Sequence, residues 1–467
     1  MSKKIDSSLP FDLQSAEAPE VINHTPWPAQ YFQHIDAYGA AFHIMVSRVS
    51  FDLSAITPES ISAPPLAVNQ TELATSDTYV GEINASSLLA ESDFAPIKPR
   101  CDVLVVNATA YAPSGKASKR WPVGLRVGDM EKKFQVNGVR RFAKSIASFG
   151  AWDMSNAEAA TQVPILYERA YGGPNVIAAQ AQLEVAGDDV NRTEAERALA
   201  GKQAEALPEF YAHNPIGTGR MSATADRDYI ASEHQRAQQK KPNNNTPARW
   251  QSIDRDGYAA PQLEAFDRPF TGQPDYPVIG LGPIAKWWSP RIALAGTYDE
   301  AWKVTQWPKP PEDHDYRYWN CAPEDQQIAF PKGGEEVVIV GLTPDGQPLR
   351  FRLPEQHLQV LLRFKVGVIK LMPMKIDTII IDMKALTLTL VRRAFVTGSL
   401  AMRKMELAIY PPGYRIQLGV ERSERDPVVG VVDPLGELAA QASAPLPAST
   451  NAAIPPGKRT GGKQNGH

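Results

Sequence analysis

The side chains that could do chemistry do not form a recognisable catalytic pattern in this sequence. Cys101 stands beside Asp102, but no base lies close enough in the sequence to indicate an activated thiolate. None of the eight histidines is paired with another at a spacing that ligates a metal. Gly172 and Gly173 could form a phosphate loop, but Pro174 removes an amide donor that such a loop needs. We therefore expect no enzyme activity, no metal and no cofactor.

Carboxylates gather in one proline-rich stretch of the chain. They are Asp299, Glu300, Glu312, Asp313, Asp315, Glu324 and Asp325. A glycosidase needs two carboxylates that face each other across a cleft. Acidic residues in proline-rich loops are more often solvated turn residues, and that is our expectation here, with a carbohydrate-active protein as the alternative.

Aromatic residues are concentrated in the same stretch. Five of the nine tryptophans fall within residues 287–319. Tryptophan and tyrosine combine a large apolar area with a polar group, which suits a protein interface and also suits packing beneath a long loop. The candidate partner-binding residues are Trp287, Trp288, Tyr298, Trp302, Trp307 and Trp319. The same residues could instead anchor an irregular segment to the core, or offer a platform for a sugar.

The elements that must position these residues are predicted to be strands. The 467-residue chain is 43% hydrophobic and holds 40 prolines and 32 glycines, as is natural for short strands joined by turns. We expect a mainly β (α+β) fold, with antiparallel sheets in a sandwich-like body, a small helical and loop insertion, and a disordered C-terminal tail. Length alone allows either about three domains or one large β-rich body.

Alternating and continuous apolar runs locate these strands. Strands are expected at 42–46 and 102–106, and hairpins at 123–136, 337–353 and 376–390. The predicted order is a flexible arm (1–25), a β-rich region (26–175), a helical and polar insertion (176–275), an aromatic-rich segment with a second β-rich region (276–433), and a disordered tail (434–467). Within the insertion, a capping box at 193–196 predicts a short helix, and residues 223–249 are polar.

Charge and apolar patterning indicate a cytoplasmic protein. The net charge of −3 offers no basic field for nucleic acid or anionic lipid. Positive charges interrupt the apolar stretch 358–374, so it should not insert into a membrane, and no apolar run follows the first residues as in a secretory signal. Cys101 and Cys321 could pair, but we expect two free thiols in a reducing cytosol.

Several sequence blocks together resemble the family known as domain of unknown function 2169. In order they are ESDFAPIKP (91–99) with CDVLV (101–105), AYAP (110–113), PILYERAYGG (164–173), NPIGTG (214–219), WSPR (288–291), AGTYDEAW (295–302) and NCAPEDQQ (320–327). The resemblance covers about residues 38–330 and continues more weakly to about 420. Asn107 stands where the family pattern has glycine.

This resemblance implies an adaptor, or effector chaperone, of bacterial type VI secretion. Such adaptors bind a toxin effector through its PAAR-carrying N-terminal region, stabilise it, and help to load it on the VgrG spike. The family supplies no catalytic motif. Within its blocks, Glu168 with Arg169, and Arg291 with Asp299, could form buried ion pairs. The alternatives are a carbohydrate-binding or carbohydrate-active β-sandwich that uses the Trp-rich segment, and a structural spike component.

Overall fold

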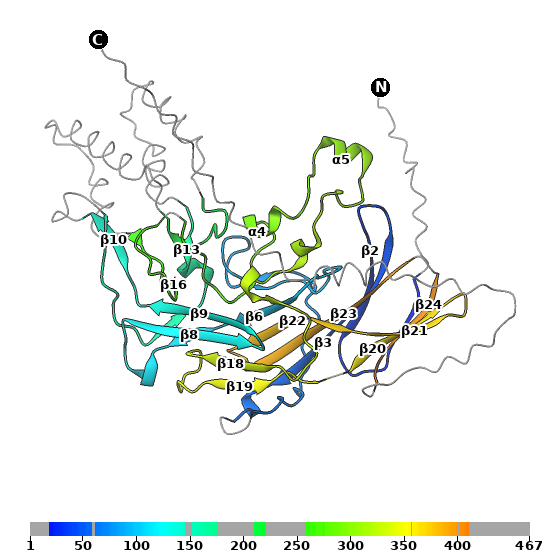
Figure 1. The fold of residues 1–467 in the computed structure, drawn as a ribbon, viewed down its shortest axis with the longest axis horizontal. Helices are drawn as coiled ribbons and strands as arrows, with labels where there is room; N and C mark the ends of the chain where they lie inside the picture. Colours follow the sequence, from blue (N-terminus) through cyan, green and yellow to red (C-terminus); the bar gives the residue numbers. More distant parts are fainter. Residues whose placement is uncertain are drawn as a thin grey trace, which may run out of the picture. The chain divides into compact units, whose positions relative to one another are not determined.

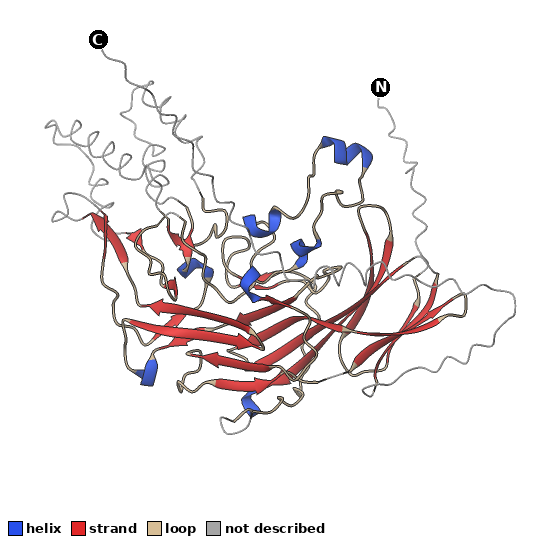
Figure 2. Cartoon of the chain, in the orientation of Figure 1, coloured by secondary structure: helices blue, strands red, loops and turns tan. Residues whose placement is uncertain are grey.

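Strands provide most of the regular structure of the protein (Figure 2). The computed structural model describes residues 18–57, 61–144, 152–174, 210–220, 258–273, 275–355, 357–398 and 401–410. All of these residues lie within one compact unit, Met1–Arg422. The mainly β fold with antiparallel sheets is confirmed. The capping-box helix, the polar stretch 223–249 and the tail 434–467 fall outside the described residues.

The largest sheet has six strands and contains two of the longest strands of the chain (Figure 1). Its order is β17 (Gln327–Ile328), β6 (Cys101–Val106), β22 (Lys375–Asp382), β23 (Thr387–Thr397), β3 (Ala41–Asp52) and β2 (Ala29–Ile35). β6 and β22 are parallel, and the other pairs are antiparallel. All six residues of β6 are buried, as the continuous apolar run at 103–106 predicts for most of the strand.

Two further sheets extend the β structure. The five-stranded sheet has the order β16 (Leu263–Ala265), β9 (Met130–Asn137), β8 (Arg120–Val127), β18 (Glu336–Val340) and β19 (Leu349–Arg352). The four-stranded sheet has the order β1 (Glu20–Asn23), β24 (Met402–Ile409), β20 (Leu358–Phe364) and β21 (Ile369–Pro373). The first of these strands, β1, lies inside the range predicted as a flexible arm, and it pairs in parallel with β24.

The three hairpins predicted from alternating apolar residues are confirmed. β8 pairs with β9, β18 with β19, and β22 with β23, each time as antiparallel neighbours. In β8 the burial alternates between the core and the outside along most of the strand, because side chains of a strand point to opposite faces in turn. One hydrophobic cluster includes Val123 of β8, Leu390 of β23 and Leu362 of β20, so all three larger sheets contribute to a common core.

Smaller sheets and short helices complete the described structure. The smaller sheets are formed by β10 (Arg141–Lys144), β11 (Trp152–Met154) and β15 (Tyr258–Ala259); β7 (Thr109–Tyr111) and β12 (Gln162–Pro164); β13 (Tyr171–Gly172) and β14 (Thr218–Gly219); and β4 (Thr78–Tyr79) and β5 (Leu88–Ala90). The helices are α4 (Ser289–Ile292), α5 (Glu300–Thr305), and the 3-10 turns η1 (Leu53–Ala55), η2 (Pro113–Gly115), η3 (Tyr167–Arg169), η5 (Tyr316–Trp319) and η6 (Glu324–Gln326). Within the described ranges, no helix has the length and apolar character to cross a bilayer.

Candidate protein-binding site

The six predicted aromatic residues all lie in one segment, residues 287–319, which we call the aromatic arm. It contains α4, α5 and η5, with α5 at the tip of a long loop (Figure 1). Its first two tryptophans have opposite roles. Trp288 is 1% exposed and packs edge-on against Tyr167, with ring centroids 5.1 Å apart, whereas Trp287 is 38% exposed. The two tryptophans differ in exposure because the turn before α4 directs their side chains in different directions.

A buried ion pair fastens the base of the aromatic arm. The guanidinium of Arg291 meets both carboxylate oxygens of Glu91, at 2.6 and 2.9 Å, and also donates to the carbonyl oxygens of Ile284 and Tyr318. Burial opposes the charge of Arg291, but attraction to Glu91 outweighs it and raises the pKa of Arg291. The expected pairing of Arg291 with Asp299 is therefore wrong.

Asp299 has a different task, because it caps α5. Its side chain accepts a hydrogen bond from the backbone N–H of Trp302 at 2.8 Å, which satisfies one of the free amides at a helix start. The expected pair of Glu168 with Arg169 is also wrong. Glu168 accepts from the backbone and hydroxyl of Ser87, and Arg169 donates to Gln262.

His314 ties the two ends of the aromatic arm together. Trp319 Nε1 donates to His314 Nε2 at 3.2 Å. His314 Nδ1 lies 2.9 Å from the carbonyl oxygen of Ala295 and must be the donor there. Asp313 accepts from both the amide and the hydroxyl of Thr297, at 2.9 and 2.7 Å. These contacts close the loop at its base.

The tip of the aromatic arm exposes apolar side chains. Tyr298 is 54% exposed, Val304 84% and Trp307 55%. Trp302 is half-buried, stacks edge-on with Tyr298 at 4.7 Å, and donates its Nε1 hydrogen to the carbonyl oxygen of Lys309. Such side chains add little to the core, and clustered apolar exposure on a protein surface often marks a contact with another molecule.

The structure divides the six candidates into four groups. Trp288 belongs to the core, Trp319 is half-buried at the base of the aromatic arm, and Trp287 is exposed beside α4. The remaining three, Tyr298, Trp302 and Trp307, lie within α5 or close to its ends. Among the described residues, no ring contact joins Trp287 to the α5 group.

A further exposed aromatic residue escaped the sequence analysis. Tyr38 is 79% exposed at the turn between β2 and β3. This turn lies against the aromatic arm, because a Cβ atom placed on Gly39 would be 3.5 Å from Cδ of Lys309. The Tyr38-Gly39 pair just before a predicted strand could have indicated a turn with an exposed aromatic residue. The structure confirms the turn, where Gly39 adopts a φ of 85°.

Both cysteines and several of the carboxylates considered above lie in structural contacts. Cys101 and Cys321 are free, as expected, and buried. Burial raises the pKa of both thiols well above its usual value, which disfavours the reactive thiolate. Asp102 contacts Lys98 at 2.8 Å in the same buried region, and Asp325 contacts Lys132 at 2.9 Å. The part of the chain that is described contains no group of three His, Cys, Asp or Glu residues suited to a metal.

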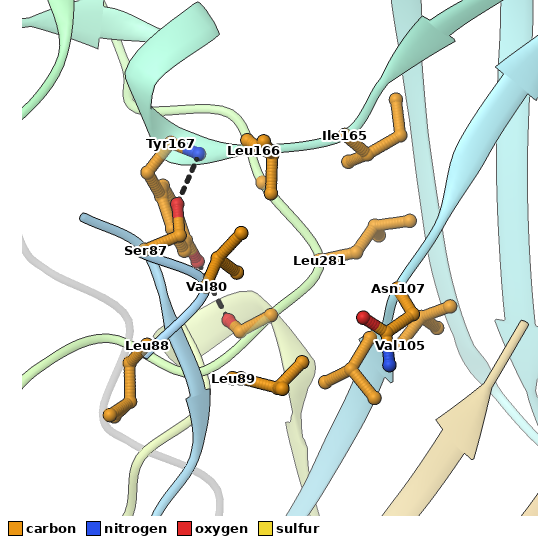
Figure 3. Close-up of a pocket in the computed structure, with 13 residues that line it drawn as sticks. Val80, Ser87, Leu88, Leu89, Val105, Asn107, Ile165, Leu166, Tyr167 and Leu281 are labelled. Carbon is orange, nitrogen blue, oxygen red and sulfur yellow. Dashed lines mark hydrogen bonds between the residues drawn. The ribbon is translucent and has the colours of Figure 1, made fainter. Parts of the chain in front are cut away.

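A small cavity lies where β5, β6 and η3 meet (Figure 3). Its walls are mostly aliphatic, with Leu88, Val105 and Leu281 among them, and it has room for little more than a water molecule. Its polar groups already have partners, because Tyr167 donates its hydroxyl hydrogen to Gly282 O and its amide hydrogen to Ser87 Oγ. This cavity does not present a reactive group to a substrate.

Comparison with known proteins gives one match. Residues 39–393 match the family described as "Uncharacterized protein conserved in bacteria (DUF2169)". No curated protein and no solved structure matches the chain. The match covers more than half of the chain. It runs from the start of β3 into β23 and includes the whole aromatic arm.

Proposed function

Because the chain belongs to the DUF2169 family, we propose that it is a non-enzymatic adaptor of type VI secretion that binds a toxin effector. In this proposal it works in the bacterial cytoplasm, holds the PAAR-carrying N-terminal region of the effector, and promotes loading of that effector on the VgrG spike. The sequence blocks that resemble type VI adaptors support the class of partner. The aromatic arm supports the mode of binding.

The observation that carries the proposal is the exposed tip of the aromatic arm. Tyr298, Val304 and Trp307 face solvent at α5, while Trp288 and Arg291 hold the base in place. Aromatic side chains of this kind are enriched among the residues that contribute most to protein binding. A stable interface buries roughly 1,600 Å² in total, so the aromatic arm would supply its centre and neighbouring surfaces its rim.

Binding of this kind would protect the effector by mass action. An adaptor that binds only the loading-competent conformation raises the population of that conformation, and stabilises it by about 2.7 kcal/mol when the free adaptor is at about 100 times the dissociation constant. Apolar segments of the effector would contact the aromatic arm instead of aggregating. No reaction step is required of the adaptor.

The proposal can be tested with the PAAR-carrying effector encoded in the same genome. We expect the purified chain to bind the N-terminal region of that effector in titration calorimetry, and we expect effector levels in cells to fall when the adaptor gene is deleted. Normal effector level, loading and killing of competitors in the deletion strain would refute the proposal. Binding of a polysaccharide, but not of the effector, would favour the carbohydrate alternative.

A further inference from the structure

The strand β2 forms one edge of the six-stranded sheet, and half of its backbone groups point outward. It pairs antiparallel with β3 along its whole length. Just before the strand, Arg48 N donates to Pro28 O at 3.1 Å, so the even-numbered positions are the ones that bond to β3. The N–H groups of Ala29, Tyr31 and Ile35 therefore point away from β3. No strand in the described ranges pairs with this outer edge.

The composition of β2 is unusual for an edge strand. Natural proteins protect sheet edges from pairing with charged residues, prolines or very short strands. The edge strand β21 carries Lys370 and Pro373, β19 carries Arg350 and Arg352, and β1 has only four residues and starts with Glu20. β2 has seven residues, AQYFQHI, without an acidic residue, lysine, arginine or proline.

The one histidine of β2 also carries no charge at neutral pH. Burial, together with repulsion from His314, lowers the pKa of His34 to about 4, against a weaker opposing effect of Asp36. Every side chain of β2 is therefore neutral under physiological conditions. A regular edge strand of this length with no charged side chain and no proline is the form that an added strand requires.

This edge is continuous with the aromatic arm. The ring of His34 lies 6.3 Å from the ring of Tyr316 in η5, and the exposed Tyr38 follows β2 at the turn beside Lys309. A polypeptide that contacts the tip of the aromatic arm could thus reach the outer side of β2 without leaving the surface of the adaptor.

We infer that the outer edge of β2 binds an extended, uncharged segment of the partner protein as an additional β-strand. This inference rests on the proposed adaptor function and adds the mode of recognition. The outward N–H and C=O groups of β2 recognise a main chain in extended conformation, which gives affinity without requiring one particular sequence. The aromatic arm then selects apolar side chains at one end of that segment.

The inference can be tested by removing one outward amide. Ile35→Pro deletes an N–H that points to the outer edge, and proline is tolerated at edge positions where the N–H does not bond within the sheet. Ile35→Ala is the matched control, because it shortens the same side chain but keeps the amide. With the effector N-terminal region as the probe, we expect Ile35→Pro to bind about tenfold more weakly than Ile35→Ala, from one lost hydrogen bond.

A second measurement follows the amides directly. In the wild-type complex with the same probe, hydrogen exchange of a peptide covering residues 29–35 should slow by at least about tenfold, because outward amides gain partners. This measurement decides the question alone if Ile35→Pro does not fold. Equal affinity of the two variants, or unchanged exchange while the effector is bound, would overturn the strand inference and leave the adaptor proposal intact.

Two other outcomes also count against the inference. A dimer of the wild-type chain that Ile35→Pro abolishes would show that the edge pairs with a second copy instead. A wild-type chain that does not bind the effector at all would overturn both the adaptor function and the strand inference, which separates this failure from the failure of the strand alone.

Discussion

Removal of the Glu91 carboxylate should destabilise the protein more than removal of any exposed side chain of the aromatic arm. The side chains of Glu91 and Arg291 are 5% and 2% exposed, and their closest atoms are 2.6 Å apart. When one partner of such a buried pair is removed, the remaining charge is uncompensated, at a cost of about 3–5 kcal/mol. In Glu91→Gln, Arg291 keeps only neutral acceptors, the carbonyl oxygens of Ile284 and Tyr318. We expect a loss of about 3–5 kcal/mol in the free energy of unfolding.

The two partners should depend on each other. In Arg291→Met, Glu91 retains Lys286 at 3.3 Å, but this side chain is 29% exposed and compensates only in part. The double variant Glu91→Gln with Arg291→Met leaves no unpaired charge between the two positions, so its loss should be smaller than the sum of the single losses by about 1–3 kcal/mol. Urea unfolding followed by tryptophan fluorescence measures all three values.

The pH dependence provides a second check of the same pair. Burial raises the pKa of Glu91, but Arg291 outweighs burial and holds the pKa of Glu91 below its ordinary value. A lowered folded-state pKa means that the stabilisation is present at neutral pH and is lost as the pH falls through that value. Glu91→Gln should therefore show a flatter decline of stability in acid. Additive single losses, or an acid decline that is identical in Glu91→Gln, would refute the reasoning.

Three further predictions concern the core, the thiols and the tail. Trp288→Ala should lower the free energy of unfolding by about 3–5 kcal/mol. Trp307→Ala should leave stability unchanged and weaken effector binding by about 2–4 kcal/mol. If thermal melting and calorimetry show the reverse pattern, the assignment of Trp288 to the core and Trp307 to the surface is wrong. Cys101 and Cys321 should react with a thiol reagent only after denaturant is added, and rapid labelling of the native protein would disprove their inertness. Truncation after Asp433 should shift the melting temperature by no more than a few degrees. The removed residues are rich in Ala, Pro, Ser and Gly, and burying them cannot offset the entropy lost when they are ordered. A larger fall in melting temperature would show that these residues pack against the rest of the protein.

The sequence predicted local strand pairs well, for a simple physical reason. A strand with one buried face must alternate apolar and polar residues, and a turn between two such strands fixes their pairing. Leu125 in β8 and Phe134 in β9 showed this pattern, and the structure confirms both strands as neighbours. The hairpin of β20 and β21 was missed because Arg363 and Lys370 interrupt its apolar run, and the strands show no clear alternation of burial.

Contacts between distant parts of the chain could not be predicted. Glu91 and Arg291 are 200 residues apart, and no local pattern marks them as partners, so the sequence suggested the nearer Asp299 instead. The parallel pairing of β6 with β22 likewise depends on the whole fold. The backbone conformation at Asn107 could be anticipated. Asn107 stands where the family pattern has glycine, and its φ is 50°, a value that asparagine tolerates better than most residues.

The contrast between the base and the tip of the aromatic arm argues for a binding role. A buried ion pair gains little net stability over apolar packing, yet the base of the aromatic arm contains one, between Glu91 and Arg291, which ties the loop to a distant part of the chain. The tip, by contrast, leaves Val304 and Trp307 in solvent, where they contribute almost nothing to folding. A loop held in one shape loses less entropy when a partner binds to it, so rigidity at the base increases the affinity that exposed side chains at the tip can provide. Folding alone does not require this combination, whereas recognition of another protein does benefit from it.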